Sequence, residues 1–159
     1  MKNFLILLLS IFFFSCQQKE NKNTAVPVTE SPSPAKKEMK ENKQMGDTIF
    51  MNYKNENGLF TAEGLVDSIQ SHVYIKFKNE YPAKLNGKII PEPGLGNIRF
   101  NQIIFPDKTS DGPFGIELKT NIEQKGDYIL VIGHSQMADG KYWGKFKVEI
   151  ENKKRETGN

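Results

Sequence analysis

Cysteine, tryptophan and histidine are scarce in this chain of 159 residues, which holds one Cys, one Trp and two His. A single cysteine excludes an intrachain disulfide. His72 and His134 cannot complete a zinc site without scattered carboxylates, so we expect neither a metal nor another cofactor. After the apolar N-terminal stretch, no window of about twelve residues keeps an apolar period of 3.6, so long helices are not expected either. What is present is a series of short β-branched and aromatic segments, which favours an all-β fold.

The N-terminus has the features of an export signal. Lys2 gives a short basic region, and residues 4–14 are apolar except for Ser10. At about 1.5 Å per residue this segment reaches only about half of a hydrocarbon core of roughly 30 Å, so it is too short to span a membrane. We therefore predict that residues 1–15 are a signal peptide.

Cys16 follows this apolar segment and the small residue Ser15, an arrangement that resembles the lipobox of bacterial lipoproteins. The resemblance implies that Cys16 becomes the acylated first residue of the mature protein. The membrane is then a partner through this lipid, because two or more acyl chains hold a protein far more firmly than one. Gln17, and not Asp, follows the cysteine, and Lys19 and Glu20 come next. By resemblance to lipoprotein sorting signals, this implies the outer membrane of the cell envelope.

Composition divides the rest of the chain into a linker, a domain and a tail. Residues 16–45 contain almost no large apolar side chain and cannot offset their ordering entropy, which predicts a lipidated cysteine followed by a flexible linker. Residues 46–152 have the length of one domain, and residues 153–159 are predicted to be a disordered tail. The domain carries twelve Lys and Arg against fourteen Asp and Glu. Nucleic-acid binding needs basic residues concentrated on a folded surface, so no nucleic-acid partner is expected.

The predicted domain consists of short apolar or alternating segments separated by turn signals. Ile116, Leu118 and Ile122 alternate with polar residues, as expected of a strand with one buried and one wet face. Turn or bulge signals with glycine occur at Asn57-Gly58, Asn86-Gly87 and Pro93-Gly94. The predicted strands are residues 47–53, 60–66, 73–78, 83–90, 98–105, 116–122, 127–132 and 145–151. This pattern predicts an antiparallel β-sandwich of seven to eight short strands.

None of the short motifs meets the requirements of a catalytic site. Ser135 follows Gly133 after a predicted strand, as in a nucleophile elbow, but the second glycine and the helix are missing. Residues 107–112, DKTSDG, form an acidic turn without the alternating acidic spacing of a calcium loop. Gly94 and Gly96 lack the third glycine of a dinucleotide fingerprint. We therefore expect that the protein is not an enzyme.

Two loops are candidates for contact with a partner. The first, residues 109–115, offers hydrogen-bonding groups at Ser110, Asp111 and Gly112 and an apolar tip at Phe114. Its position between two predicted strands is one where binding residues are common. The alternative is a plain turn in which Phe114 is tucked into the core.

The second candidate loop, residues 134–143, joins the last two predicted strands and is longer than a tight hairpin needs. Phe146 and Ile150 share the core face of the last strand with Tyr142, so Trp143 falls on the opposite face and points away from the core. The loop mixes aromatic, adaptable and charged side chains, which is typical of interface anchors. The partner-binding residues predicted in it are His134, Gln136, Met137, Lys141, Tyr142 and Trp143. The alternative is that Trp143 covers an edge of the sandwich.

Two tripeptides, Asp47-Thr48-Ile49 and Asp67-Ser68-Ile69, resemble the acceptor pattern of a general bacterial O-glycosylation. Three-residue patterns recur by chance, so the resemblance leaves open whether either hydroxyl is modified. The intact mass of the native protein decides the question.

Four segments of the predicted domain resemble the pattern of the periplasmic inhibitors of g-type and i-type lysozymes, which share a broader sandwich design with prepeptidase C-terminal domains. They are GLVD at 64–67, HVYI at 72–75, GDYILV at 126–131 and GKFKVEI at 144–150. The resemblance implies a non-catalytic β-sandwich whose protruding loops enter the substrate cleft of a lysozyme. Ser110, Gly112 and Phe114 are the nearest match to the small polar residues and the aromatic that make this contact.

The sequence therefore predicts a lipid-anchored, monomeric protein of the cell envelope that binds another protein, with a lysozyme as one candidate partner. A second hypothesis is a carbohydrate- or ligand-binding accessory module in which Tyr142 and Trp143 form a sugar-stacking platform. A third is a structural envelope lipoprotein whose linker matters more than its loops.

Overall fold

Ten β-strands make up the secondary structure of the residues that the computed structural model describes, which are residues 40–68, 71–92, 96–135 and 137–155. In chain order they are β1 (Asn42–Met45), β2 (Thr48–Phe50), β3 (Phe60–Val66), β4 (His72–Asn79), β5 (Ala83–Glu92), β6 (Arg99–Ile104), β7 (Ser110–Asp111), β8 (Glu117–Ile122), β9 (Gly126–Gly133) and β10 (Gly144–Lys154). These residues include no helix long and apolar enough to cross a membrane. Cys16, Gln136 and residues 17–39 of the predicted linker lie outside the described residues.

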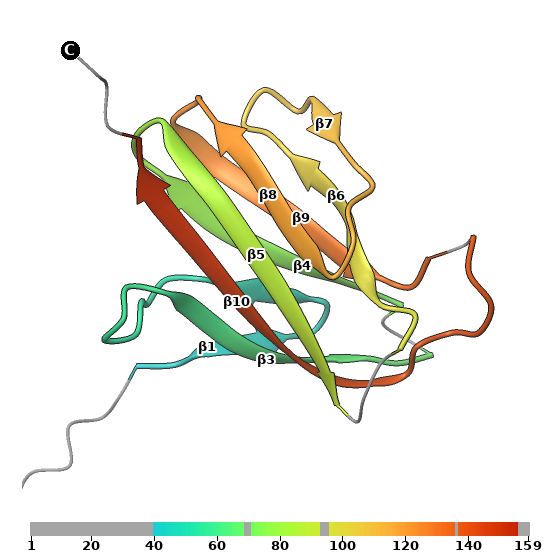
Figure 1. Cartoon of the computed structure of the whole chain (residues 1–159). Coiled ribbons are helices and arrows are strands. Elements are labelled where there is room, and N and C mark those ends of the chain that lie inside the picture. Colours follow the sequence, from blue (N-terminus) through green and yellow to red (C-terminus); the bar gives the residue numbers. More distant parts are fainter. Residues whose placement is uncertain (1–39, 69–70, 93–95, 136, 156–159) are drawn as a thin grey trace, which may run out of the picture. The chain divides into compact units, whose positions relative to one another are not determined.

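The strands form one sheet that curls into two facing layers. The strand order is β7-β6-β9-β4-β2-β1-β3-β10-β5-β8. Figure 1 shows β10, β5 and β8 lying in front of β4, β9 and β6. The predicted all-β, sandwich-like fold is thereby confirmed.

Two features of the sheet differ from the prediction. The strands number ten and not seven or eight, because the sequence pattern predicts neither β1 nor β7. The sheet is also not purely antiparallel, since β1 pairs with β3, and β2 with β4, in parallel. These parallel pairs arise because the short β1–β2 hairpin adds one strand to each layer. In addition, β10 extends to Lys154, past the predicted domain end at Asn152.

The fold begins before the predicted domain start at Gly46, because β1 lies inside the segment predicted as linker. The carboxamide of Asn42 holds this strand. Its Nδ2 donates to the carbonyl oxygens of Tyr53 and Thr61 at 2.8 and 3.0 Å, and its Oδ1 accepts from the N–H groups of Asn52 and Tyr53, both at 2.9 Å. A polar side chain thus fixes β1 to the rest of the fold, a role that apolar side chains have in most strands. The composition of the segment therefore does not predict the strand.

The core lies between the layers and requires glycine where one layer approaches the other. The ring of Phe100 in β6 lies so close to β5 that a Cβ on Gly87 would be 2.9 Å from it. Asn86-Gly87 is therefore neither a turn nor a bulge but the middle of β5, paired on both sides. Phe77 and Tyr128 stack in the same core, with ring centroids 5.5 Å apart.

Candidate functional site

In the loop of residues 134–143 between β9 and β10, the carboxamide of Asn97 holds the described residues on both sides of position 136. Asn97 Nδ2 donates to the carbonyl oxygens of Ser135, Ala138 and Gly140 at 2.9, 3.2 and 2.6 Å, and Oδ1 accepts from the N–H of Ser135 at 2.9 Å. The two hydrogens of Nδ2 are shared among three carbonyl oxygens, so one side chain contacts four backbone groups of a loop that lacks strand pairing. Asn97 is not predicted from the sequence, because it lies 38 residues before Ser135 and no local pattern marks the contact.

Tyr142 supports the loop from the core side. Its side chain is 7% exposed, and its ring leaves no room for a Cβ at Gly96. Its hydroxyl accepts from the N–H of Glu92 at 3.1 Å and lies within hydrogen-bonding distance of the carbonyl oxygens of Glu92 and Lys145. This burial corrects the prediction that Tyr142 contacts a partner, and it removes one half of the sugar-stacking platform. The physical reason is that Tyr142 is in phase with the core face of β10.

Trp143 lies on the outside, as its phase predicts, with 46% of its surface exposed. The imidazole of His134 meets its ring edge-on, with centroids 6.2 Å apart and planes inclined by 65°. Lys141 Nζ lies 5.8 Å from the centroid of the indole ring, close enough for a cation–π contact. His72, at the start of β4, continues the row with a ring centroid 6.3 Å from that of His134. The structure thus brings together residues that are far apart in the chain.

The tip of the loop is its most exposed part. Met137 is 92% exposed, and residues 138–141 are exposed as well. Together with His134 and Ser135, residues 138–141 line a shallow, open depression. We call His134, Met137, Lys141 and Trp143 the loop surface.

The other predicted loop, residues 109–115, is attached to the edge of the sheet. Ser110 and Asp111 form β7, which pairs with the end of β6. Phe114 is half-buried and packs against the core, and its N–H donates to the carbonyl oxygen of Phe100 at 2.9 Å. The structure therefore favours the alternative in which Phe114 is tucked into the core, while Ser110, Asp111 and Gly112 remain exposed.

Asn101 connects the two predicted loops. It lies at a shift of register in β6, where a bulge interrupts pairing with β9. A Cβ on Gly112, whose φ is 138°, would lie 2.6 Å from the carbonyl oxygen of Asn101, so only glycine fits there. On the other side, Asn101 Nδ2 lies 3.4 Å from the carbonyl oxygen of His134. Asn101 thus lies between Gly112, which follows β7, and His134 of the loop surface.

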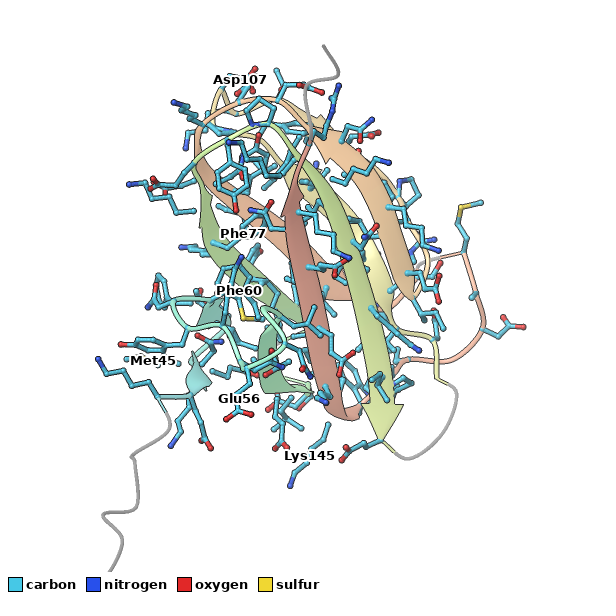
Figure 2. The ribbon with its side chains drawn as sticks, turned by 60° about the vertical axis from the view of Figure 1, so that its left-hand side comes forward. Met45, Glu56, Phe60, Phe77, Asp107 and Lys145 are labelled. Carbon is cyan, nitrogen blue, oxygen red and sulfur yellow. The ribbon has the colours of Figure 1, made fainter. Side chains whose placement is uncertain are left out.

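In the acidic turn at residues 107–112, the carboxylate of Asp107 accepts hydrogen bonds from other groups of the protein. Asp107 Oδ1 accepts from the hydroxyl and the N–H of Thr109 at 2.5 and 3.0 Å, and Oδ2 accepts from Gln124 Nε2 at 2.7 Å. The hydrogen bond from the Thr109 hydroxyl, followed by that from Gln124, lowers the pKa of Asp107. Figure 2 shows Asp107 at the end of the domain opposite to Lys145, which follows the loop surface in the chain. Over the described part of the chain, no three His, Cys, Asp or Glu side chains gather as metal ligands.

The described residues define an all-β domain of the sandwich type. No protein-family model matches the chain, and the curated proteins contain no match. Among solved structures, the chain is similar to the periplasmic inhibitors of g-type lysozyme from Salmonella Typhimurium and Aeromonas hydrophila. The identities are 16% and 10%, the TM-scores 0.49 and 0.48, and the coverage 69% and 72% of this chain and 100% of each of those chains.

A third similar structure is the pre-peptidase C-terminal domain of collagenase from Bacillus anthracis. Its identity is 14% and its TM-score 0.42, over 70% of this chain and 97% of that chain. The resemblance predicted from the sequence is thus found among the solved structures. At these identities it concerns the fold, and the function is argued from the side chains of this chain.

Proposed function

We propose that this chain is a lipid-anchored protein of the cell envelope that binds another protein, without catalysis, through its loop surface. The observation that carries the proposal is the fixed geometry of an exposed loop, with Asn97 bonded to its backbone and Tyr142 packed behind it. Such a loop loses little conformational entropy on binding, so the area that it buries contributes more fully to affinity.

The side chains of the loop surface suit a protein partner. Trp143 offers a large, half-exposed ring that His134 meets edge-on, and such rings are common among residues that dominate binding energy. Met137 is flexible and polarizable, so it adapts to an irregular partner surface. Lys141 adds a cation beside the indole. The surface thus combines one rigid anchor, one adaptable contact and one charge.

The serine of this loop has a structural role. Ser135 is buried, and its hydroxyl accepts a hydrogen bond from the N–H of Met137 at 3.2 Å. A hydroxyl in this position fixes the turn and is not presented to a substrate. This contact supports binding over hydrolysis as the activity of the loop.

A g-type or i-type lysozyme is the first partner to test, because of the sequence segments that resemble inhibitors of these enzymes. Binding would place the loop surface across the substrate cleft and block access of the cell wall. The slight acidic excess of residues 46–152 would assist encounter with a cationic lysozyme, an effect that added salt weakens.

The test mixes residues 16–159, carrying Cys16→Ser so that no lipid is present, with g-, i- and c-type lysozymes, and follows the rate of cell-wall lysis. We expect at least one enzyme to be slowed, and Trp143→Ala to weaken the effect about tenfold or more. Phe50→Ala is the matched control, since Phe50 is an aromatic residue exposed to a similar extent and lies in neither predicted loop. Unchanged lysis with all three enzymes rejects a lysozyme as the partner.

The lipid anchor is tested separately by the mass of the native protein. Acylation at Cys16 adds the mass of the acyl groups after loss of residues 1–15, and Cys16→Ser abolishes both the added mass and membrane attachment. A native protein without this mass rejects the anchor and leaves the loop surface unaffected.

A further inference from the structure

A second group of exposed apolar side chains lies where the chain enters the domain. Met45, Phe50, Tyr53 and Leu65 are large hydrophobic residues with 71%, 45%, 41% and 40% of their surfaces exposed. They belong to β1, β2, β3 and the segment just after β2. We call these four residues the N-terminal patch.

The register of the sheet directs this patch outward. Gln44 of β1 pairs with Ile49 of β2, and Ile49 is fully buried in the core. Because side chains alternate along a strand, Met45 and Phe50 both face away from the core. Gln44 also binds both backbone groups of Leu65, at 2.7 and 3.2 Å, which brings the end of β1 beside β3. Figure 2 shows Met45 at the margin of the domain, where the described chain begins.

Lysine side chains lie over the two aromatic rings of the patch. Lys40 Nζ is 5.4 Å from the centroid of the Tyr53 ring, and Lys76 Nζ is 5.6 Å from that of Phe50. Aromatic rings and lysines together are typical of the boundary between lipid and water, where rings sit among headgroups and amines reach phosphates. The N-terminal patch therefore has the chemistry of a membrane-contacting surface.

Charge alone would not attach this patch to a membrane. Lys43, which shares the outer face of β1, is paired with Glu41 at 3.7 Å, and Glu63 lies opposite it on β3. The acidic side chains offset much of the lysine charge. Contact is therefore expected to depend on the apolar side chains and to vary little with the content of anionic lipid.

The path of the chain brings the patch next to the segment that leads to the predicted lipid anchor. Lys40, the first described residue, already lies over Tyr53. Residues 17–39 thus connect Cys16 directly to the patch, and even fully extended they span at most about 80 Å. A tether of this length gives an effective concentration on the order of millimolar, at which a weak surface contact becomes occupied.

We infer that the N-terminal patch rests on the phospholipid headgroups of the membrane that holds the lipid anchor. This inference rests on the proposed anchor at Cys16 and is independent of the partner of the loop surface. The membrane contact would fix the orientation of the domain, which a linker alone leaves free.

The test uses the full acylated protein in vesicles of phosphatidylethanolamine and phosphatidylglycerol whose acyl chains carry bromine, a quencher of tryptophan fluorescence. In a Trp143→Phe chain, Phe50→Trp places the reporter in the patch, and Ile116→Trp places it at a similarly exposed position in another part of the domain. We expect the tryptophan at position 50 to lose most of its fluorescence and the one at position 116 to lose none. Circular dichroism of both variants confirms that they fold.

Each other outcome overturns the inference and shows which step fails. Equal quenching at the two positions, or none at either, overturns membrane contact while the mass of Cys16 shows the anchor intact. Protection of position 50 from aqueous acrylamide that rises with protein concentration, without quenching by bromine, assigns the patch to a second copy of the chain. A protein without acyl groups overturns both the anchor and the membrane contact.

Discussion

The carboxamide of Asn97 makes two hydrogen bonds with the backbone of Ser135, donating to its carbonyl oxygen and accepting from its N–H, both at 2.9 Å. A strand in a sheet offers its neighbour the same pair of groups. Asn97 thus continues the hydrogen bonding of the sheet past the end of β9. This bonding reaches into the loop that carries Met137 and Trp143.

Asn97→Ala should loosen the loop of residues 134–143. The substitution removes the side-chain contacts with four backbone groups at once, so we expect the free energy of unfolding to fall by about 1–3 kcal/mol and the amide protons of the loop to exchange faster. Denaturant unfolding and hydrogen exchange measure the two effects. Asn121→Ala, at an exposed position of β8, is the control and should change neither. Unaltered exchange in the Asn97 variant would show that the loop is ordered by other contacts.

Tyr142→Phe should separate support of the loop from contact with a partner. The ring stays buried and only the hydroxyl is lost, which leaves the N–H and carbonyl of Glu92 without this partner. We expect a loss of about 1–2 kcal/mol of stability, measured by denaturant unfolding, and a smaller effect on binding than that of Trp143→Ala. A binding defect as large as that of Trp143→Ala would mean that Tyr142 contacts the partner after all.

Gly64→Ala should strain the junction of β3 and β10. A Cβ at this position would overlap the ring of Phe146 and come within 3.1 Å of Gln44 Oε1. Overpacking of this kind costs about 1–3 kcal/mol. Phe146→Leu in the same chain should restore part of the loss, since it removes the overlapping ring atoms. The free energies of the two single variants and the double variant form a cycle, and strict additivity would contradict the contact.

Stability should depend on pH through Asp107. Its hydrogen bonds from Thr109 and Gln124 lower its pKa in the folded protein, so the contribution to stability is present above the pKa of the unfolded chain, about 4, and is lost as pH falls through the lower folded pKa. Asp107→Asn should therefore lower the melting temperature at neutral pH, and the difference from the native protein should shrink below about pH 4.

Glu56→Gln, at an exposed carboxylate in another turn, is the control for this pH series. Thermal unfolding of the three proteins across the acid range measures the effect. A difference between the Asp107 variant and the native protein that stays constant down to the lowest pH would contradict the role of the Asp107 carboxylate.

Strands with alternating or β-branched sequences could be predicted, and those with polar anchors could not. Phe60–Val66 is predicted with its observed bounds, because apolar side chains alternate along it. β1 escapes prediction because Asn42 holds it by four hydrogen bonds to other segments. β7 escapes because two residues are too few for a periodic pattern. Apolar periodicity in a sequence arises from contact with the core, so strands that are fixed mainly by polar contacts do not show it.

The same limit applies to the candidate site. The exposure of Trp143 could be predicted, since alternation along β10 places it opposite to Phe146. The supporting residues could not, because Asn97 and Asn101 act across the fold on segments more than 30 residues away. The predicted glycosylation pattern at Asp47-Thr48-Ile49 shows a related effect. Thr48 is a buried residue of β2, and its hydroxyl donates to Asp47 Oδ1 at 2.8 Å, which the tripeptide alone does not indicate.

The pairing of β1 has a mechanical consequence. Only two register pairs, Asn42 with Ala62 and Lys43 with Glu63, join β1 to β3. If the N-terminus is fixed to a membrane while the loop of residues 134–143 grips a moving partner, tension enters the fold at this short ladder. The pairing of β1 with β3 would break before the long pairing of β10 with β5. Under tension β1 would therefore separate first, and the rest of the sheet would stay paired.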